Sequence, residues 1–178
     1  MRQVTAAISL LFVGLSEAGA AGSSDIPPAY RQVALANHIP AEIFYALALA
    51  ESGRRLGDSR VSRPWPWTLN IHGKGIFFGD RRTAWRAAMA AIAKQKTSVD
   101  IGLMQVNWRY HHIRLKDPWH ALDPHRNLQV AAEILRNCHE RLSDWWASVG
   151  CYHSPSNAER AKRYRERVRA HWQSLVRP

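Results

Sequence analysis

Apolar residues fill every position of segment 43–50, which is followed by one acidic side chain, Glu51, and then by Ser52 and Gly53. A stretch of this length with no polar face predicts a helix buried at the centre of a domain. Pro40 stands where a helix start tolerates proline, because that N–H would have no helical partner. Gly53 is expected to adopt the left-handed conformation that often ends a helix.

Elsewhere apolar residues recur at steps of three and four, which predicts helices that bury one face. A short helix is expected over 29–37, with Val33 and Ala34 pointing inward. Asp123 followed by Pro124 predicts another helix start, and residues 156–159 form a capping-box pattern before the last helix. The two long stripes consist of Leu128, Ala131, Leu135, Cys138 and Leu142, and of Ala161, Tyr164, Val168, Trp172 and Leu175.

A different pattern separates these helices. Residues 64–71 and 76–78 are predicted as two strands of a hairpin, with 72–75 as the turn. Thr83 is expected to cap a helix that follows. We interpret residues of about 60–97 as an inserted hairpin plus helix, in a fold that is mainly α (α+β). The inner face of the inserted helix would carry Trp85, Met89 or Ala88, and Ile92.

The N-terminal segment has the pattern of an export signal. Arg2 precedes an apolar stretch over 6–15, and Ala18-Gly19-Ala20 is typical of a cleavage site. We expect residues 1–20 to be a cleaved signal peptide and residues 21–178 to form one domain in the periplasm. A retained N-terminal membrane anchor is the alternative interpretation.

Charge and cysteine content fit an exported protein. Lys and Arg total 25 against 14 Asp and Glu, a formal net charge of +11. Such an excess indicates an acidic partner, and outside the cytoplasm anionic peptidoglycan or lipid head groups are better candidates than nucleic acid.

The only two cysteines, Cys138 and Cys151, predict one disulfide that joins a helix to the segment after it. Two buried free thiols are the alternative.

Glu51 is the first candidate for chemistry. Apolar surroundings disfavour the charged form of a carboxyl group, and the negative end of a helix acts in the same direction. A carboxylic acid that keeps its proton near neutral pH can act as a general acid, the group that glycosidic bond cleavage requires. A capping or ion-paired glutamate at the helix end is the structural alternative.

Three ordered motifs carry a family resemblance: Glu51-Ser52-Gly53, then Gly102-Leu103-Met104-Gln105, then Cys151-Tyr152-His153-Ser154. Together they resemble the soluble-lytic-transglycosylase domain of family 1 type, and most of all small secreted members associated with conjugation and type IV secretion machines. The resemblance spans roughly Pro28 to Trp172. It implies a lysozyme-like fold and cleavage of the MurNAc–GlcNAc β-1,4 bond with formation of 1,6-anhydroMurNAc.

The resemblance also implies roles for two carboxylates. Glu51 would first protonate the bridging oxygen and then take the proton of the MurNAc C6 hydroxyl, which attacks C1. Segment 98–107 is also similar to the second-carboxylate segment of c-type lysozymes. By that similarity Asp100 would stay ionised and stabilise positive charge at C1. An aspartate that only caps a turn before Gly102 is the other interpretation.

Four further residues are candidates for substrate binding. Gln105 and Asn107 alternate along a segment expected to be extended, so both would face the cleft. By resemblance they bind hydroxyl and acetamido groups, and Met104 is an apolar cleft residue, unless it is simply core. Tyr152 would orient Glu51 or the acetamido group, or else would pack in the core with its hydroxyl satisfied locally.

The chain departs from the family pattern at two places. The usual third motif A-Y-N-A-G is replaced by residues 151–155, so the sugar-binding role of its Asn does not transfer to His153. The 51 positions from Glu51 to Gly102 exceed what the plain domain needs. We expect the inserted hairpin to line one end of the cleft, where Trp65 and Trp67 either stack on sugar rings or pack within the hairpin.

The sequence therefore predicts a monomeric peptidoglycan lytic transglycosylase that opens the wall locally for a conjugation or secretion apparatus. No metal site, cofactor or nucleic-acid partner is expected, although there are nine histidines. A lysozyme-type hydrolase that uses Glu51 with Asp100 is the nearest alternative, and a non-catalytic wall-binding assembly factor is a further one. Arg160, Arg163 and Arg167 are interpreted as a solvated basic face rather than a DNA-binding surface.

Overall fold

The computed structural model describes residues 26–55, 57, 61–94 and 98–177, and the expected signal peptide over 1–20 lies outside them. The helices within these ranges are α1 (Pro28–Ala36), α2 (Ala41–Ser52), α3 (Arg81–Ala93), α4 (Trp108–Leu115), α5 (Pro118–Ala121), α6 (Pro124–Leu142), α7 (Trp145–His153) and α8 (Ala158–Val176). The strands are β1 (Gly53–Arg55), β2 (Ser62–Pro64), β3 (Thr68–Ile71), β4 (Lys74–Phe77), β5 (Val99–Ile101) and β6 (Val106–Asn107). The fold is mainly α with a small β part, as predicted.

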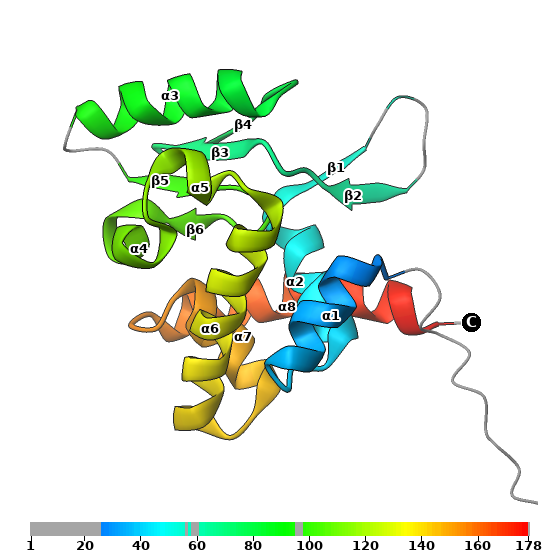
Figure 1. Cartoon of the computed structure of the whole chain (residues 1–178). Coiled ribbons are helices and arrows are strands. Elements are labelled where there is room, and N and C mark those ends of the chain that lie inside the picture. Colours follow the sequence, from blue (N-terminus) through cyan, green and yellow to red (C-terminus); the bar gives the residue numbers. More distant parts are fainter. Residues whose placement is uncertain (1–25, 56, 58–60, 95–97, 178) are drawn as a thin grey trace, which may run out of the picture.

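The elements divide into a helical part and a smaller β part. Figure 1 shows α1, α2, α6, α7 and α8 gathered below an antiparallel sheet that is covered by α3. The sheet has the strand order β4-β3-β5-β6, while β1 and β2 form a separate pair that leads out of α2. The chain therefore passes from the core helix directly into the β part.

Helix α2 occupies the centre of the core, and α1, α8 and β2 pack against it. Phe44 and Leu47 are among its fully buried side chains, which confirms the prediction from its apolar circumference. The expected left-handed conformation of Gly53 is wrong: its φ is −57° and its ψ is 122°, because the chain runs straight on into β1. Gly53 is instead required for a steric reason, since a Cβ at this position would lie 2.3 Å from the carbonyl oxygen of Leu49.

Two of the three predicted helix caps are corrected by the structure. Asp123 caps α6 as predicted, accepting a hydrogen bond from the backbone N–H of Arg126. Helix α3 is capped by Asp80 rather than Thr83, and α8 by Asn157 rather than Ser156. In both corrected cases the cap has extended backbone and a short side-chain oxygen that reaches the N–H three residues on, the geometry that capping requires.

The predicted hairpin is present as β3 and β4, joined by the two-residue turn His72-Gly73 with positive φ at both positions. It begins at Thr68 rather than at residue 64, because Pro64 pairs with Gly53 of β1 and residues 65–67 lead through a turn into β3. Strand β3 also pairs with β5, which places Asn70 opposite Asp100. The hairpin and the second sequence motif thus belong to one sheet.

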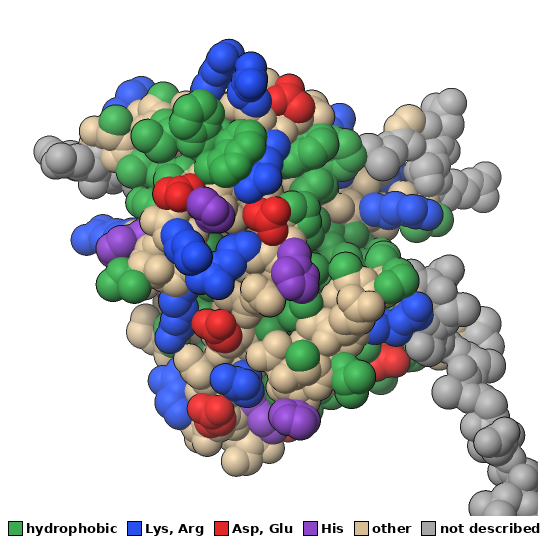
Figure 2. Space-filling model, in the orientation of Figure 1, with side chains coloured by type: hydrophobic (Ala, Val, Ile, Leu, Met, Phe, Trp, Pro, Cys, Tyr) green, Lys and Arg blue, Asp and Glu red, His purple; other side chains and the backbone are tan. Residues whose placement is uncertain are grey.

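The disulfide prediction is confirmed: Cys138 on α6 is bonded to Cys151 on α7. The buried stripe of α6 ends at Cys138, because Leu142 is 45% exposed in the last turn of the helix. Figure 2 shows apolar side chains gathered toward the end of the molecule that carries α3 and the hairpin, with basic side chains spread over the rest of this face. The partly exposed apolar residues at that end include Ile76, Phe77, Met89 and Trp119.

No single helix of the described part is both long enough and apolar enough to cross a membrane. Taken together, α1 and α2 reach that length and composition, but the chain bends by 120° between them. Because α2 is buried in the core, we attribute its apolar composition to packing.

Candidate active site

Glu51 lies in the last turn of α2, where its side chain meets α8. The hydroxyl of Tyr164 donates a hydrogen bond to Oε1 of Glu51. Tyr164 is itself only 3% exposed, so this hydroxyl is held in place by the packing of α8 on α2. The structure thus fixes one carboxylate oxygen through a residue 113 positions away in the sequence.

Burial dominates the electrostatics of Glu51. Desolvation raises its pKa from 4.5 to about 7, and the negative charge of Asp100 acts in the same direction. The Tyr164 hydrogen bond and the positive charge of Arg167 both lower the pKa, but by less than burial raises it. A carboxyl group with a pKa near neutral pH can both donate and accept a proton, which general acid–base chemistry requires.

Asp100 lies in the sheet, close enough to Glu51 for its charge to affect the pKa of that carboxyl. It lies in β5, and its Oδ1 accepts a hydrogen bond of 2.6 Å from Nδ2 of Asn107 in β6. Burial raises the pKa of Asp100, while the Asn107 hydrogen bond opposes the rise. The two carboxyls thus differ in their partners: a phenol hydroxyl holds Glu51, and an amide holds Asp100.

The loop over residues 102–105 is hydrogen-bonded to α2, β3 and α7. Ser52, next to Glu51, donates from its hydroxyl to the carbonyl oxygen of Leu103 at 2.6 Å. Gly102 donates from its backbone N–H to the carbonyl oxygen of Thr68 at 2.8 Å. The hydroxyl of Tyr152 on α7 donates to the carbonyl oxygen of Met104 at 2.7 Å. The position of Glu51 is therefore coupled to this loop through the residue that follows it.

Asn127 on α6 is the buried anchor of that loop. Its Oδ1 accepts from the N–H of Met104 at 2.8 Å, and its Nδ2 donates to the carbonyl oxygens of Ile101 and Ala121 at 2.8 and 3.0 Å. Asn127 is completely buried, and such a side chain is stable only when its polar atoms are paired. A single amide thus holds the turn that joins β5 to β6.

The predicted binding residues lie around this loop, but their polar atoms are largely engaged by protein. Met104 is fully buried in the core. Gln105 has a φ of +44° and lies in the turn, so the expected extended segment from Gln105 to Asn107 is wrong. Its Nε2 donates to the carbonyl oxygens of Gly102 and Thr68. Contact of Met104, Gln105, Asn107 and Tyr152 with sugar stays a prediction.

Sequence reasoning misses two residues of this site. The apolar stripe of the last helix predicts that Tyr164 faces inward, but not that its hydroxyl meets Glu51. Asn127 belongs to no motif at all. The one available signal is an asparagine at an inward position of α6, one residue before Leu128 in an otherwise apolar stripe. A buried amide at such a position indicates a backbone that lacks regular hydrogen-bond partners.

The two tryptophans before the hairpin pack on each other, with ring centroids 5.5 Å apart and planes nearly perpendicular. The Trp65 indole N–H donates to the carbonyl oxygen of Phe78, and the guanidinium of Arg54 lies over its ring. These contacts fix the tryptophans within the hairpin region. Stacking of either ring on a sugar stays a prediction.

Comparison with known proteins identifies one family. Residues 78–174, more than half of the chain, match the sequence model of the family described as Transglycosylase SLT domain. Asp100, Tyr152 and Tyr164 lie within the matched range, while Glu51 precedes it. No curated protein and no solved structure matches the chain. Among the described residues, no three His, Cys, Asp or Glu side chains are grouped as a metal site.

Proposed function

Because the chain belongs to the transglycosylase SLT domain family, we propose that it cleaves the MurNAc–GlcNAc β-1,4 bond of peptidoglycan with Glu51 as the catalytic acid. The family has a lysozyme-like fold, and its domain is that of lytic transglycosylases, lyases that act on glycan strands. The observation that carries the proposal is the environment of Glu51, which is desolvated and hydrogen-bonded to Tyr164, so that burial raises its pKa to about 7.

In the proposed reaction Glu51 donates its proton to the bridging oxygen, and the bond between C1 of MurNAc and O4 of GlcNAc breaks. The GlcNAc 4-hydroxyl leaves, and positive charge develops at C1 of MurNAc. The negative charge of Asp100 stabilises this oxocarbenium-like state. Glu51, now a carboxylate, accepts the proton of the MurNAc C6 hydroxyl as that oxygen attacks C1. The ring closes to 1,6-anhydroMurNAc, Glu51 regains its proton, and no water is consumed.

Tyr164 acts in this scheme as a positioning residue for Glu51. It donates to the carboxylate and so favours the charged form. Replacing Tyr164 with Phe should raise the pKa of Glu51 and move the alkaline limb of kcat/KM from about pH 7 to higher pH, with a roughly tenfold lower maximum. The measurement is the pH profile of glycan cleavage.

Tyr152 provides the matched control for this prediction, since its hydroxyl donates to a backbone carbonyl rather than to Glu51. Tyr152→Phe should lower thermal stability but leave the alkaline limb in place. An unchanged limb in Tyr164→Phe, or an equal shift in both variants, would contradict the assignment of Tyr164.

The place of action proposed is the periplasm, because the substrate is cell-wall glycan and residues 1–20 have the pattern of an export signal. Local opening of the wall for a conjugation or type IV secretion apparatus is proposed from sequence resemblance alone. The protein is proposed to work as a monomer without a cofactor.

The test is mass analysis of the fragments released from purified sacculi by the mature protein. Anhydro ends, about 18 mass units below the corresponding reducing ends because one water is not added, are expected in about equal number to the cleaved bonds. Reducing ends would instead assign lysozyme-type hydrolysis with Asp100 as the second carboxylate. Binding to sacculi without any release of fragments would support a non-catalytic wall-binding factor.

A further inference from the structure

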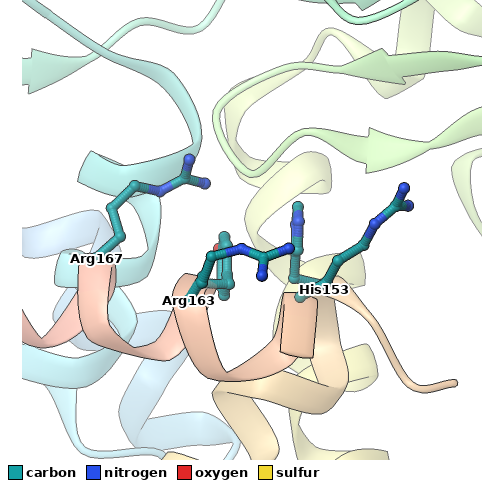
Figure 3. A pocket seen from close by; sticks show the side chains of 5 residues that line it. His153, Arg163 and Arg167 are labelled. Carbon is teal, nitrogen blue, oxygen red and sulfur yellow. The ribbon is translucent and has the colours of Figure 1, made fainter. Parts of the chain in front are cut away.

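A cationic hollow opens beside the tyrosine that holds Glu51. Its volume is about 320 Å³, and it is lined by His153 from α7 and by Arg160, Arg163, Tyr164 and Arg167 from α8. The three arginines are spaced by three and four residues, which puts them on one face of the helix. In Figure 3, Arg163 and Arg167 project from α8 to the same side as His153 from α7.

These arginines, Arg160, Arg163 and Arg167, form no ion pair with a carboxylate of the described residues. Burial and the charges of Arg167 and Arg160 lower the pKa of His153, so at neutral pH the hollow offers three guanidinium groups and an uncharged imidazole. Three guanidinium groups held together without an ion-paired carboxylate create a positive potential that favours an anion.

The hollow and the active site share one wall. The His153 ring stacks on the Tyr164 ring with centroids 4.1 Å apart and planes within 2° of parallel, and the Arg167 guanidinium lies 4.9 Å from the centroid of that ring. The hydroxyl of the same tyrosine holds Glu51. An anion bound in the hollow is therefore separated from the proposed acid by little more than one aromatic ring.

We propose that this hollow binds a carboxylate of the peptide that MurNAc carries, so that the enzyme recognises peptide-bearing glycan. The inference rests on the proposed function. Guanidinium forks match carboxylates in geometry as well as in charge. In intact peptidoglycan the lactyl carboxyl of MurNAc is bound in an amide to the peptide, so the free carboxylates close to the scissile bond belong to the peptide. The hollow thus fits the anionic part of the substrate rather than a further sugar.

Occupation of the hollow has a consequence for Glu51. The groups that face this carboxyl are Tyr164 and Arg167 from α8, Tyr152 from α7 and Asp100 from β5. Among them Arg167 lowers the pKa of Glu51, and a bound carboxylate would offset its charge. The alkaline limb of kcat, which reports the enzyme–substrate complex, should then lie at higher pH than the limb of kcat/KM, which reports the free enzyme.

The experiment measures binding in the Glu51→Gln protein, so that it does not depend on turnover. Two probes are compared: soluble glycan strands that carry peptides, and the same strands after an amidase has removed the peptides and the lactyl carboxyl groups freed in this way have been converted to amides. Peptide-bearing strands should bind roughly tenfold more tightly, the effect of two exposed charge pairs. The added substitutions Arg160→Gln and Arg163→Gln should remove this difference and leave the affinity for bare strands unchanged.

Lys162→Gln is the matched control, because it removes one exposed charge from α8 at a position outside the hollow. It should change neither affinity by more than about twofold.

Equal binding of the two probes, or an equal loss of affinity for both in the arginine variant, would overturn the proposal. Suppression by acetate at constant ionic strength, without any dependence on the peptide, would assign a site for free anions only. Tighter binding of duplex DNA than of peptide-bearing strands would also overturn it.

Failure of this inference can be distinguished from failure of the proposed function. Release of anhydro fragments by the wild-type protein, without a preference for peptide-bearing strands, would leave the function standing and remove the carboxylate site. Preferential binding of peptide-bearing strands without fragment release would do the reverse.

Discussion

Replacing Glu51 with Gln should abolish glycan cleavage and at the same time make the folded protein more stable above pH 7. Glutamine keeps the shape of the side chain but has no proton to donate and cannot accept one from the MurNAc hydroxyl. General acid–base catalysis contributes about 10²- to 10⁴-fold, and Glu51 supplies both steps, so we expect kcat to fall by at least about a thousandfold. Release of fragments from sacculi measures this loss.

The stability gain follows from the raised pKa of Glu51. The charged carboxylate is penalised in the folded state, where the pKa is about 7, relative to the unfolded chain, where it is 4.5. The penalty is absent below pH 4.5, grows between pH 4.5 and 7, and is complete above pH 7. It amounts to about 3 kcal/mol, or roughly 5–10 °C in Tm for a domain of this size. The Glu51→Gln variant escapes this penalty at every pH, because its amide does not ionise.

Thermal unfolding of the wild type and of Glu51→Gln at pH 4 and pH 8 checks the prediction. The Tm values should nearly coincide at pH 4 and separate at pH 8, with the variant higher. Asp100→Asn serves as the comparison, because it removes a charge that raises the pKa of Glu51 but leaves the acid itself in place. A Tm difference that does not change with pH, or a variant that keeps a tenth of wild-type activity, would contradict the role given to Glu51.

The core could be predicted because its sequence signals are local and redundant. The apolar circumference of α2 predicts a central helix, and the stripe of α6 predicts its buried face down to Cys138. Asp123 followed by Pro124 marks a helix start in two independent ways, because aspartate is favoured as the N-cap and proline at the first helical position. Such patterns depend on neighbours within a few turns, so they do not require knowledge of the fold.

The hydrogen bonds of the site could not be predicted in this way. Both Tyr152 and Tyr164 face inward, and spacing alone does not tell which hydroxyl reaches Glu51. Tyr164 does, because α8 packs directly on α2, while Tyr152 on α7 reaches the loop at Met104 instead. The choice depends on helix packing between segments more than a hundred residues apart.

The motif over residues 102–105 shows a second limit of prediction from sequence, which concerns the roles of its side chains. Family resemblance assigns its side chains to the sugar, but in the structure much of their hydrogen-bonding capacity holds the turn itself. Gln105 closes the turn onto Gly102 and Thr68, and Met104 fills the core. A short motif at an active site can thus be required for the position of the acid rather than for contact with the substrate.

Replacing Gly102 with Ala should be among the most damaging single substitutions in the chain. Gly102 has a φ of +85°, and a Cβ there would lie 2.6–2.9 Å from three side-chain atoms of Asn127. The left-handed backbone alone costs about 1 kcal/mol for alanine. Moving Asn127 also leaves the buried N–H of Met104 and two carbonyl oxygens without hydrogen-bond partners. This loss costs about 1–3 kcal/mol of folding stability. We expect a total loss of about 2–4 kcal/mol and a Tm lower by roughly 5–15 °C.

Gly73→Ala separates the cost of the left-handed backbone from the cost of the contact with Asn127. Gly73 has nearly the same φ, +81°, but open space where the Cβ would be. This control should therefore cost only about 1 kcal/mol. Activity should also fall in Gly102→Ala and not in Gly73→Ala, because the loop holds Ser52 and so the end of the helix that carries Glu51.

A double-mutant cycle identifies the contact responsible. Asn127→Ala removes the atoms that the new Cβ would meet, but leaves the same backbone groups unpaired. Once Asn127 is gone, Gly102→Ala should therefore cost little more than Gly73→Ala, so the double variant should be clearly more stable than the sum of the single effects predicts. Strict additivity in urea unfolding, or equal costs for Gly102→Ala and Gly73→Ala, would show that the amide of Asn127 does not fix this turn. In that case the coupling from α6 through the loop to Glu51 would have to be abandoned, since its first step, from α6 to the loop, is made by that one buried side chain.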